Sequence, residues 1–229
     1  MALYAIGDLH LSLSSDKPMD VFGEAWANHV ERLEKGFGQL NDGDTTVLCG
    51  DLSWGMDLEQ SLADFRFINA LPGRKLLVKG NHDYWWCTAA KMQRFFQENG
   101  LDRIEIIHNN CALYGDVALC GTRGWFFEED KKGSHDEKVF LRELGRLEAS
   151  LAAAGEREKL CFLHYPPLYR GYRCEEILAL LRRYGVKRCC YGHLHGPAHA
   201  LRIEGNCGGT EFSLVSADFL QFIPRKIED

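Results

Sequence analysis

The chain has 229 residues and a hydrophobic content of 45%, so it can bury a large core, and we expect one domain spanning residues 1–229. Its formal net charge is −6, and its longest Lys/Arg run has two residues, which disfavours a docking surface for duplex nucleic acid. Its apolar runs fall short of the roughly 18 residues of a membrane span, so we expect no membrane insertion.

The first half alternates two patterns. Apolar runs of four to six residues predict strands that are covered on both faces, and apolar residues at helical spacing predict helices between them. Strands are predicted at 2–7, 46–50 and 75–80, and helices at 18–40, 57–71 and 88–99. This alternation is typical of an α/β fold.

From residue 104 onward the pattern changes to short strands separated by turns, which indicates antiparallel hairpins. Helices and buried strands then alternate again, and two strand-like pieces form the tail. The predicted strands are 104–107, 111–114, 117–120, 159–163, 188–192, 199–204 and 211–215, and the predicted helices are 134–155 and 175–184.

The nine cysteines indicate a reducing environment. Their number is odd, no C-x-x-C pair occurs, and five lie inside apolar strand-like runs, where cysteine acts as a small hydrophobic residue. The N-terminus enters a predicted strand without the apolar h-region of a secretory signal. We therefore expect a cytoplasmic protein.

Residues capable of binding a metal follow five of the predicted strands. They are Asp8, His10, Asp51, Asn81, His82, His164, His193 and His195. Open parallel sheets place their sites at the carboxyl ends of the strands. Carboxylates and imidazoles without thiolates suit borderline or hard divalent ions, and seven such residues would fill two sites if one carboxylate bridged them.

These residues occur in five short motifs. The motifs are Asp8-Leu-His10, Gly50-Asp51, Gly80-Asn-His-Asp83, the single His164 and Gly192-His-Leu-His195. In order and type they resemble the five blocks of the calcineurin-like metallophosphoesterase superfamily. The resemblance implies a four-layer α/β/β/α sandwich of two mixed sheets, with the site where the strand ends of both sheets meet.

The resemblance also implies roles for single residues. Asp8, His10 and His195 would hold one metal ion; Asn81, His164 and His193 would hold a second; Asp51 would bridge both; His82 would face the substrate as the catalytic histidine. We expect two divalent ions per chain, with Mn²⁺ or Fe first and Zn²⁺ or Mg²⁺ as alternatives.

The physical logic of such a site is direct. Two divalent ions about 3.5–4 Å apart generate hydroxide near neutral pH and hold phosphoryl oxygens for in-line attack. A general acid such as His82 typically contributes about 10²–10⁴-fold by protonating the leaving oxygen. We therefore predict a two-metal-dependent phosphohydrolase that cleaves a mono- or diester of a small metabolite or nucleotide, with a metal-bridging hydroxide as nucleophile.

Substrate contacts are less clearly indicated. In the related Ser/Thr protein phosphatases an Asp and an Arg follow the second block, whereas Leu52-Ser-Trp-Gly-Met56 follows Asp51 here, so a phosphoprotein substrate is doubtful. Asp83 or Asp57 could orient His82, although Asp83 could equally stabilise its turn. Arg123 is either a phosphate clamp or an exposed loop arginine.

Several aromatic residues follow the motifs. Trp54, Tyr84, Trp125 and Tyr165 could wall a substrate pocket, or they could simply pack in the core. His199 lies outside the five motifs and is interpreted as a surface or helix-face histidine. We expect a small phosphorylated substrate, and the sequence indicates no protein partner. The alternatives are a nuclease and a non-catalytic scaffold that keeps the fold.

Overall fold

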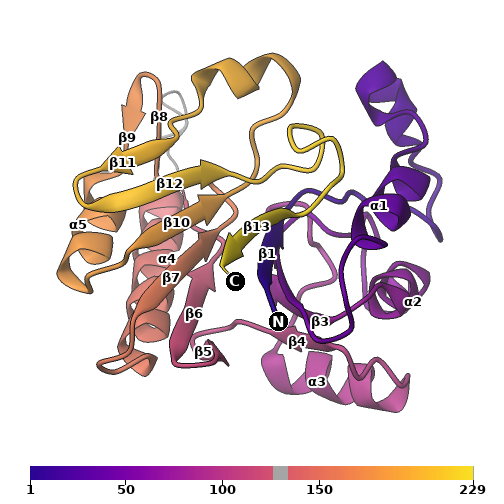
Figure 1. The fold of residues 1–229 in the computed structure, drawn as a ribbon, viewed down its shortest axis with the longest axis horizontal. Helices are drawn as coiled ribbons and strands as arrows, with labels where there is room; N and C mark the ends of the chain where they lie inside the picture. The colour runs from indigo at the N-terminus through magenta and orange to yellow at the C-terminus, as the bar shows by residue number, and fades with distance from the viewer. Residues whose placement is uncertain (126–133, 229) are drawn as a thin grey trace.

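The structure, a computed structural model, describes residues 1–125 and 134–228. Two large sheets face each other in the middle of the molecule, and helices cover their outer faces (Figure 1). In the described ranges, no helix has the length and apolar character that a membrane crossing requires.

The first sheet has the strand order β13-β1-β2-β3-β4, with β1 to β4 parallel and β13 antiparallel at the edge. Helices cover its outer face (Figure 1). The strands are β1 (Leu3–Ile6), β2 (Thr45–Cys49), β3 (Arg74–Val78), β4 (Ile104–Ile106) and β13 (Arg225–Glu228), and the helices are α1 (His29–Phe37), α2 (Leu62–Ala70) and α3 (Ala89–Glu98).

The second sheet has the order β11-β12-β10-β7-β6-β5, with antiparallel strands at both edges and parallel strands between them. Helices α4 (Ser134–Ala153) and α5 (Glu175–Arg183) cover its outer face. Its strands are β5 (Cys111–Tyr114), β6 (Val117–Thr122), β7 (Lys159–Leu163), β10 (Arg188–Tyr191), β11 (Gly205–Cys207) and β12 (Thr210–Leu214); β8 (Leu168–Tyr169) and β9 (Tyr172–Arg173) form a separate hairpin.

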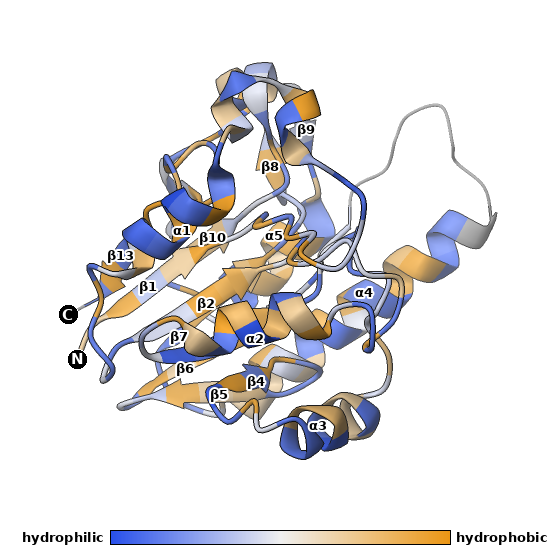
Figure 2. Cartoon of the chain, turned by 90° about the vertical axis from the view of Figure 1, so that its right-hand side faces the viewer, coloured by the Kyte–Doolittle hydropathy of each residue, from blue (hydrophilic) through white to orange (hydrophobic). Residues whose placement is uncertain are grey.

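Three clusters of buried apolar residues separate four layers. One cluster joins α1, α2 and α3 to the first sheet, and another joins α4 and α5 to the second. The third lies between the sheets and includes Val47, Leu119 and Phe162. Successive strand residues point to opposite faces, which is why Val47 and Leu48 belong to different clusters. Figure 2 shows apolar residues along the strands between the helical layers. The predicted four-layer α/β/β/α sandwich is confirmed.

The two sheets join at one point beside the strand ends. The Gly7 N–H donates to the Val215 carbonyl oxygen at 2.7 Å, and the Ala217 N–H donates to the Gly7 carbonyl oxygen at 3.0 Å. These bonds form a short parallel bridge between Gly7 and Ser216. The carboxyl end of β1 is thereby held against the carboxyl end of β12.

The prediction of antiparallel pairing for 104–107 is wrong. β4 joins the first sheet parallel to β3, because α3 provides the crossover that parallel neighbours require. The antiparallel hairpin consists of β5 and β6 alone.

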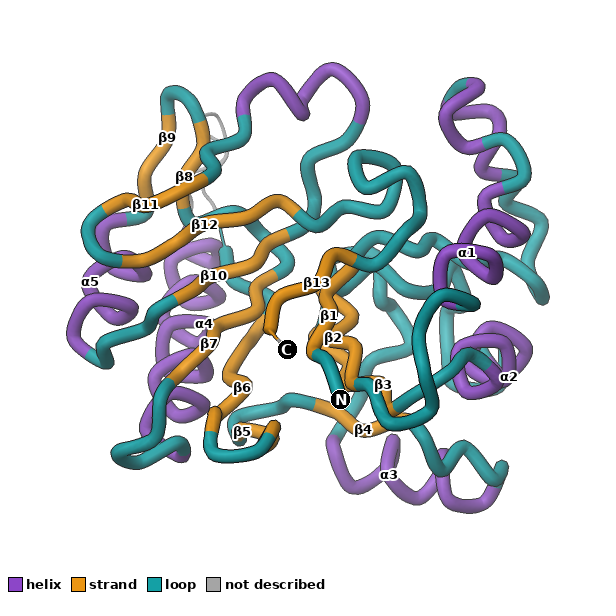
Figure 3. Tube along the Cα trace, viewed as in Figure 1, coloured by secondary structure: helices purple, strands orange, loops and turns teal. Residues whose placement is uncertain are grey.

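The tail also differs from the prediction. Residues 199–204 were expected as a strand, but Gly196–Leu201 is a 3₁₀ helix with Pro197 in its first turn, and the strand is β11. The hairpin to β12 turns at Gly208 and Gly209, whose φ values are 63° and 92°. The chain then returns to place β13 beside β1 (Figure 3).

Two predicted helices are shorter than expected. The stretch 18–40 contains two short 3₁₀ helices before α1, because Gly23 at φ 115° and Asn28 at φ 52° interrupt it. The stretch 57–71 begins with a turn in which the Asp57 carboxylate accepts the Gln60 N–H at 2.8 Å, and α2 starts only at Leu62.

Candidate metal centre

The loops that carry the proposed ligands have an unusual backbone. Asp8, His10, Asp51 and His193 have φ values of 60°, 46°, 53° and 73°. Positive φ is uncommon for residues other than glycine, and such strain persists only where the surrounding structure holds it. Four such residues in one place indicate a site whose geometry is fixed by the fold.

Glycines allow these loops to approach each other closely. A Cβ atom on Gly50 would lie 2.6 Å from the Gly80 Cα, and one on Gly192 would overlap the Asp8 carboxylate. Real Cβ atoms do not approach so closely, so a larger residue would push the loops apart. This explains why glycine precedes the first ligand residue in four of the five motifs.

Asp8, His10 and His195 form the first ligand group, with one potential ligand atom from each within 4.8 Å of the others. His195 Nε2 lies 3.4 Å from Asp8 Oδ1, while its Nδ1 hydrogen-bonds Asp218 Oδ1 at 2.9 Å. In the described part of the chain, the buried Nε2 has no hydrogen-bond partner. A carboxylate on Nδ1 and an open Nε2 are typical of a metal-ligating histidine, so this group fits a divalent ion.

His164 belongs to a second group with Asp8 and Asp51. Its Nδ1 lies 3.1 Å from the Cys49 carbonyl oxygen, and its Nε2 lies 2.6 Å from Asn81 Oδ1. When Nδ1 donates to the carbonyl, Nε2 presents a lone pair to the lone pairs of the Asn81 oxygen. A cation shared by both atoms would relieve that repulsion, so this pair also fits a metal ion.

Asp8 belongs to both groups, and Asp51 of the second group also faces the first. Its Oδ2 is 3.5 Å from His164 Nε2 and 3.9 Å from His10 Nε2, and its Oδ1 accepts the His82 N–H at 2.7 Å. His193 completes the cluster, since its N–H approaches both Asp8 carboxylate oxygens at 3.0 and 3.2 Å. The structure therefore brings all seven predicted ligands together.

The electrostatics of the cluster favour a bound cation. Burial, together with the neighbouring Asp8 carboxylate, raises the pKa of Asp51 to about 8. Burial also lowers the pKa of His193 to about 3, which keeps that imidazole in the neutral form that binds metals. Buried carboxylates and neutral imidazoles in contact are a donor set that a divalent ion would stabilise.

His82 lies beside the two groups rather than within them. Its half-buried ring is 4.7 Å from the Trp54 ring and 5.9 Å from the His10 ring, centroid to centroid. Its Nδ1 is 3.3 Å from the Tyr84 hydroxyl oxygen. The bond from its main chain to Asp51 thus ties the His82 loop to the ligand cluster.

Asp83 makes the contacts of the second role considered for it, because it stabilises its own turn through the Gly80 N–H. Its buried carboxylate accepts the N–H groups of Asp51, Leu52 and Gly80 at 2.9, 2.8 and 2.7 Å, and the Trp85 indole N–H at 3.0 Å. Asp57 is exposed in its own turn. In the described ranges neither carboxylate hydrogen-bonds the His82 ring, so Asp83 holds two ligand loops together instead.

Asp218 belongs to the site although it lies outside the five sequence motifs. This carboxylate contacts His195 Nδ1, accepts the Gly196 N–H at 3.1 Å and lies 3.2 Å from His199 Nε2. His199, expected at the surface or on a helix face, is a half-buried neighbour of the cluster in a 3₁₀ helix. The pattern that identified the other site residues also applies to Asp218, because this residue likewise follows an apolar strand.

The predicted substrate residues surround the cluster. Trp54 stacks on His10 at 5.1 Å, and Tyr165 packs against His193 at 4.6 Å, between ring centroids. Trp125 lies beside Tyr165 at 6.1 Å, whereas Tyr84 is 51% exposed. Arg123 is not an exposed loop arginine, since its side chain is only 16% exposed and pairs with Glu143 at 3.3 Å.

Sequence comparison connects this arrangement to known proteins. A family model described as calcineurin-like phosphoesterase matches residues 1–197. The chain is also 27% identical over 206 residues to the glycerophosphodiester phosphodiesterase GpdQ of Enterobacter lignolyticus (strain SCF1), a match that covers 85% of this chain and 71% of that one.

Two solved structures share the fold. The phosphopantetheinyl hydrolase PptH of Mycobacterium tuberculosis has a TM-score of 0.61 at 13% identity, covering 99% of this chain and 95% of that one. A protein of unknown function from Aquifex aeolicus has a TM-score of 0.51 at 16% identity, covering 98% and 95%. With most of its length matched by the family model, this chain belongs to the calcineurin-like phosphoesterases and is a metal-dependent phosphoesterase.

Proposed function

We propose that the protein hydrolyses a small phosphorylated metabolite or nucleotide at a two-metal centre. The observation that carries this proposal is the position of Asp51, whose Oδ2 faces His10 of one ligand group and His164 of the other. Asp8, His10 and His195 would hold one ion, Asn81, His164 and His193 the other, and Asp51 would bridge them. Mn²⁺ or Fe suits these ligands.

Bound divalent ions would supply a nucleophilic water near neutral pH and neutralise charge on the phosphoryl group. The chain's own residues attract the phosphate and shield the substrate from water. Asn81 is a neutral ligand, so the centre retains positive charge that attracts a phosphate. Trp54 and Tyr165 flank the cluster and can exclude water from one side of the substrate.

His82 is the proposed general acid. Because its Nδ1 faces the Tyr84 hydroxyl oxygen, its Nε2 is the atom that would donate a proton to the leaving oxygen. Its main-chain bond to Asp51 keeps this donor at a fixed place relative to the ligands. Its ring packs against Trp54 and faces the Tyr84 hydroxyl at the edge of the cluster, which supports a role in chemistry rather than in metal binding.

The setting of the protein is part of the same proposal. All nine cysteines are free, which supports a reducing, cytoplasmic environment.

The cluster of buried residues between the two sheets supports the interpretation of residues 1–229 as one domain. The relative GpdQ is named for a glycerophosphodiester, which favours a small-molecule phosphoester over the nuclease alternative.

The deciding experiment measures metal content by mass spectrometry, then turnover of p-nitrophenyl phosphate and bis-p-nitrophenyl phosphate with added Mn²⁺. Two ions per chain and turnover of either ester support the proposal, and the preferred ester identifies a phosphatase or a phosphodiesterase. Folded protein that binds no ion and cleaves neither ester with Mn²⁺, Fe²⁺ or Zn²⁺ would support the non-catalytic scaffold instead.

A further inference from the structure

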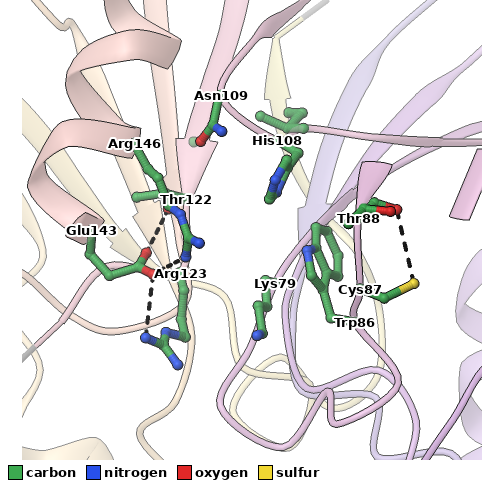
Figure 4. Close-up of a pocket in the computed structure, with 12 residues that line it drawn as sticks. Lys79, Trp86, Cys87, Thr88, His108, Asn109, Thr122, Arg123, Glu143 and Arg146 are labelled. Carbon is green, nitrogen blue, oxygen red and sulfur yellow. Dashed lines mark hydrogen bonds and ion pairs between the residues drawn. The ribbon is translucent and has the colours of Figure 1, made fainter. Parts of the chain in front are cut away.

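A cavity of 340 Å³ lies next to the metal centre. Lys79 and Trp86, from the chain that follows β3, form one wall, and Arg123, Glu143 and Arg146 form the facing wall (Figure 4). Arg123 follows β6, and the other two residues belong to α4. The cavity therefore opens where the two sheets diverge beyond their strand ends.

The charge of the cavity is positive, although the chain as a whole carries −6. Among the described residues, three cationic side chains line it, and Glu143 is the one carboxylate. Glu143 is already engaged, since it contacts Arg146 at 2.6 Å and Arg123 at 3.3 Å and accepts the Thr122 hydroxyl at 2.9 Å. Within the described ranges, no ion pair or hydrogen bond is made by the Lys79 ammonium group. Over the part of the chain that the structure describes, the cavity thus carries more positive than negative charge.

Two N–H groups of the residues that line the cavity lack a hydrogen-bond acceptor among the described residues. These are Arg123 Nε and Trp86 Nε1, and both atoms are buried. A buried donor without a partner destabilises a folded protein, so an acceptor is expected at such a place. Two open N–H donors beside a free ammonium group match the several acceptor oxygens of an oxyanion.

The cavity and the metal centre are built on neighbouring segments of the chain. Lys79 stands two residues before Asn81, so their Cα atoms are at most about 7 Å apart. On the other wall, the Arg123 carbonyl oxygen accepts the N–H groups of His164 and Tyr165 at 3.2 and 2.8 Å. A molecule of metabolite size can therefore reach both places at once.

We propose that this cavity binds a second oxyanion of the substrate, so that the preferred substrates are phosphoesters carrying another phosphate or carboxylate group. This inference rests on the proposed function of the metal centre. Lys79 and Arg123 hold the second anion, and Trp86 donates its indole N–H to it. Three cations in one cavity fit a single anionic group, whereas a nucleic-acid backbone needs an extended basic surface.

The test compares three non-hydrolysable inhibitors on the metal-loaded protein: an alkylphosphonate, a phosphonoalkanoate and an alkane bisphosphonate, each in several chain lengths. All three present one phosphonate to the metal centre, and the last two add a carboxylate or a second phosphonate. We expect the doubly anionic inhibitors of suitable length to bind roughly 10- to 100-fold more tightly, as for hydrogen bonds to charged groups. Their ranking distinguishes carboxylate from phosphate.

Lys79→Met should remove most of this advantage, whereas Lys91→Met, which deletes the exposed lysine on α3, should leave it intact. Lys79→Gln is the second variant if the first does not fold. Calorimetric titration gives the same ranking without turnover. Equal binding of all three inhibitors, or an advantage that survives both Lys79 variants, would overturn the inference even if p-nitrophenyl esters are cleaved. Absence of cleavage would instead count against the proposed function.

Discussion

The two sheets contribute different chemistry to the candidate metal centre. Loops after strands of the first sheet provide the two proposed carboxylate ligands, the amide and the proposed general acid, whereas the proposed ligands from the second sheet are all imidazoles. The first set is Asp8, His10, Asp51, Asn81 and His82, and the second is His164, His193 and His195. The two sets are also fixed differently. Asp83 ties the β2 and β3 loops of the first sheet together, and Asp218 holds His195 in the second.

This division means that neither sheet can build the centre alone. The His164 ring is positioned by the Cys49 carbonyl oxygen of the opposite sheet, and the His193 N–H approaches the Asp8 carboxylate across the same boundary. Metal affinity should therefore depend on the packing of the sheets as well as on the ligands. Four predictions test this comparison, ordered by their expected effect on turnover.

The largest effect is expected from Asp51→Asn, which changes the proposed bridging ligand of the first sheet without changing its shape. Without this carboxylate the metal centre should lose several kcal/mol of transition-state stabilisation. We therefore expect kcat/KM to fall by about 10³-fold or more. Metal analysis should show that both ions bind more weakly. Asp57→Asn, at an exposed carboxylate, is the matched control and should behave as the parent protein. A variant that keeps two tight ions would contradict the bridging role.

His82→Ala should separate chemistry from metal binding within the first sheet. We expect kcat to fall by about 10²-fold or more, because the leaving oxygen loses its proton donor, while the metal content stays at the parent value. Turnover of esters with a range of leaving groups measures the effect, which should be smallest for the most acidic leaving group. Loss of metal would instead place His82 among the ligands.

Asp218→Asn tests the second sheet. Removing a carboxylate that orients a ligating histidine typically costs 10–100-fold in metal affinity or activity. We expect weaker metal binding and a turnover that excess Mn²⁺ largely restores, in contrast to His82→Ala. Asp116→Asn, in the exposed turn between β5 and β6, is the control. If excess metal restored nothing, Asp218 would act on something other than the affinity of His195 for its ion.

The sequence predicted the clustering of the ligand residues for a physical reason. Parallel strands end at the same edge of a sheet, so side chains that follow buried apolar runs must converge there. Asp8, Asp51 and His164 could be named on that basis, and the structure places them together. Their roles as ligands stay predictions. Asp218 obeys the same rule but lies outside the five motifs, so it was overlooked.

Other features could not be predicted from local sequence patterns. β13 contains the short polar stretch Arg225–Glu228, in which only Ile227 is fully buried, and its pairing with β1 depends on the return of the whole chain. Residues 199–204 alternate between apolar and polar residues, as in a strand. Their first half nevertheless belongs to the 3₁₀ helix that follows His195. The positive φ values of Asp8 and Asp51 are likewise imposed by tertiary contacts, since neither residue prefers them by itself.

The smallest effect on turnover is expected from Leu119→Ala, which leaves every ligand in place. Leu119 is fully buried between the two sheets, so its truncation should lower the free energy of unfolding by about 2–5 kcal/mol. Leu113→Ala on the neighbouring strand, where the leucine is 45% exposed, controls for the same change at the surface.

If the centre requires both sheets in register, Leu119→Ala should also weaken metal binding, and saturating Mn²⁺ should return kcat to nearly its parent value. Titration with Mn²⁺, followed by turnover and by thermal unfolding, measures both effects. Added metal should raise the Tm, because an ion that binds only the native protein stabilises it by mass action. A variant that lost stability but kept the parent metal affinity would show that the ligand loops hold their geometry independently of the core between the sheets, and the dependence argued from His164 and His193 would then be wrong.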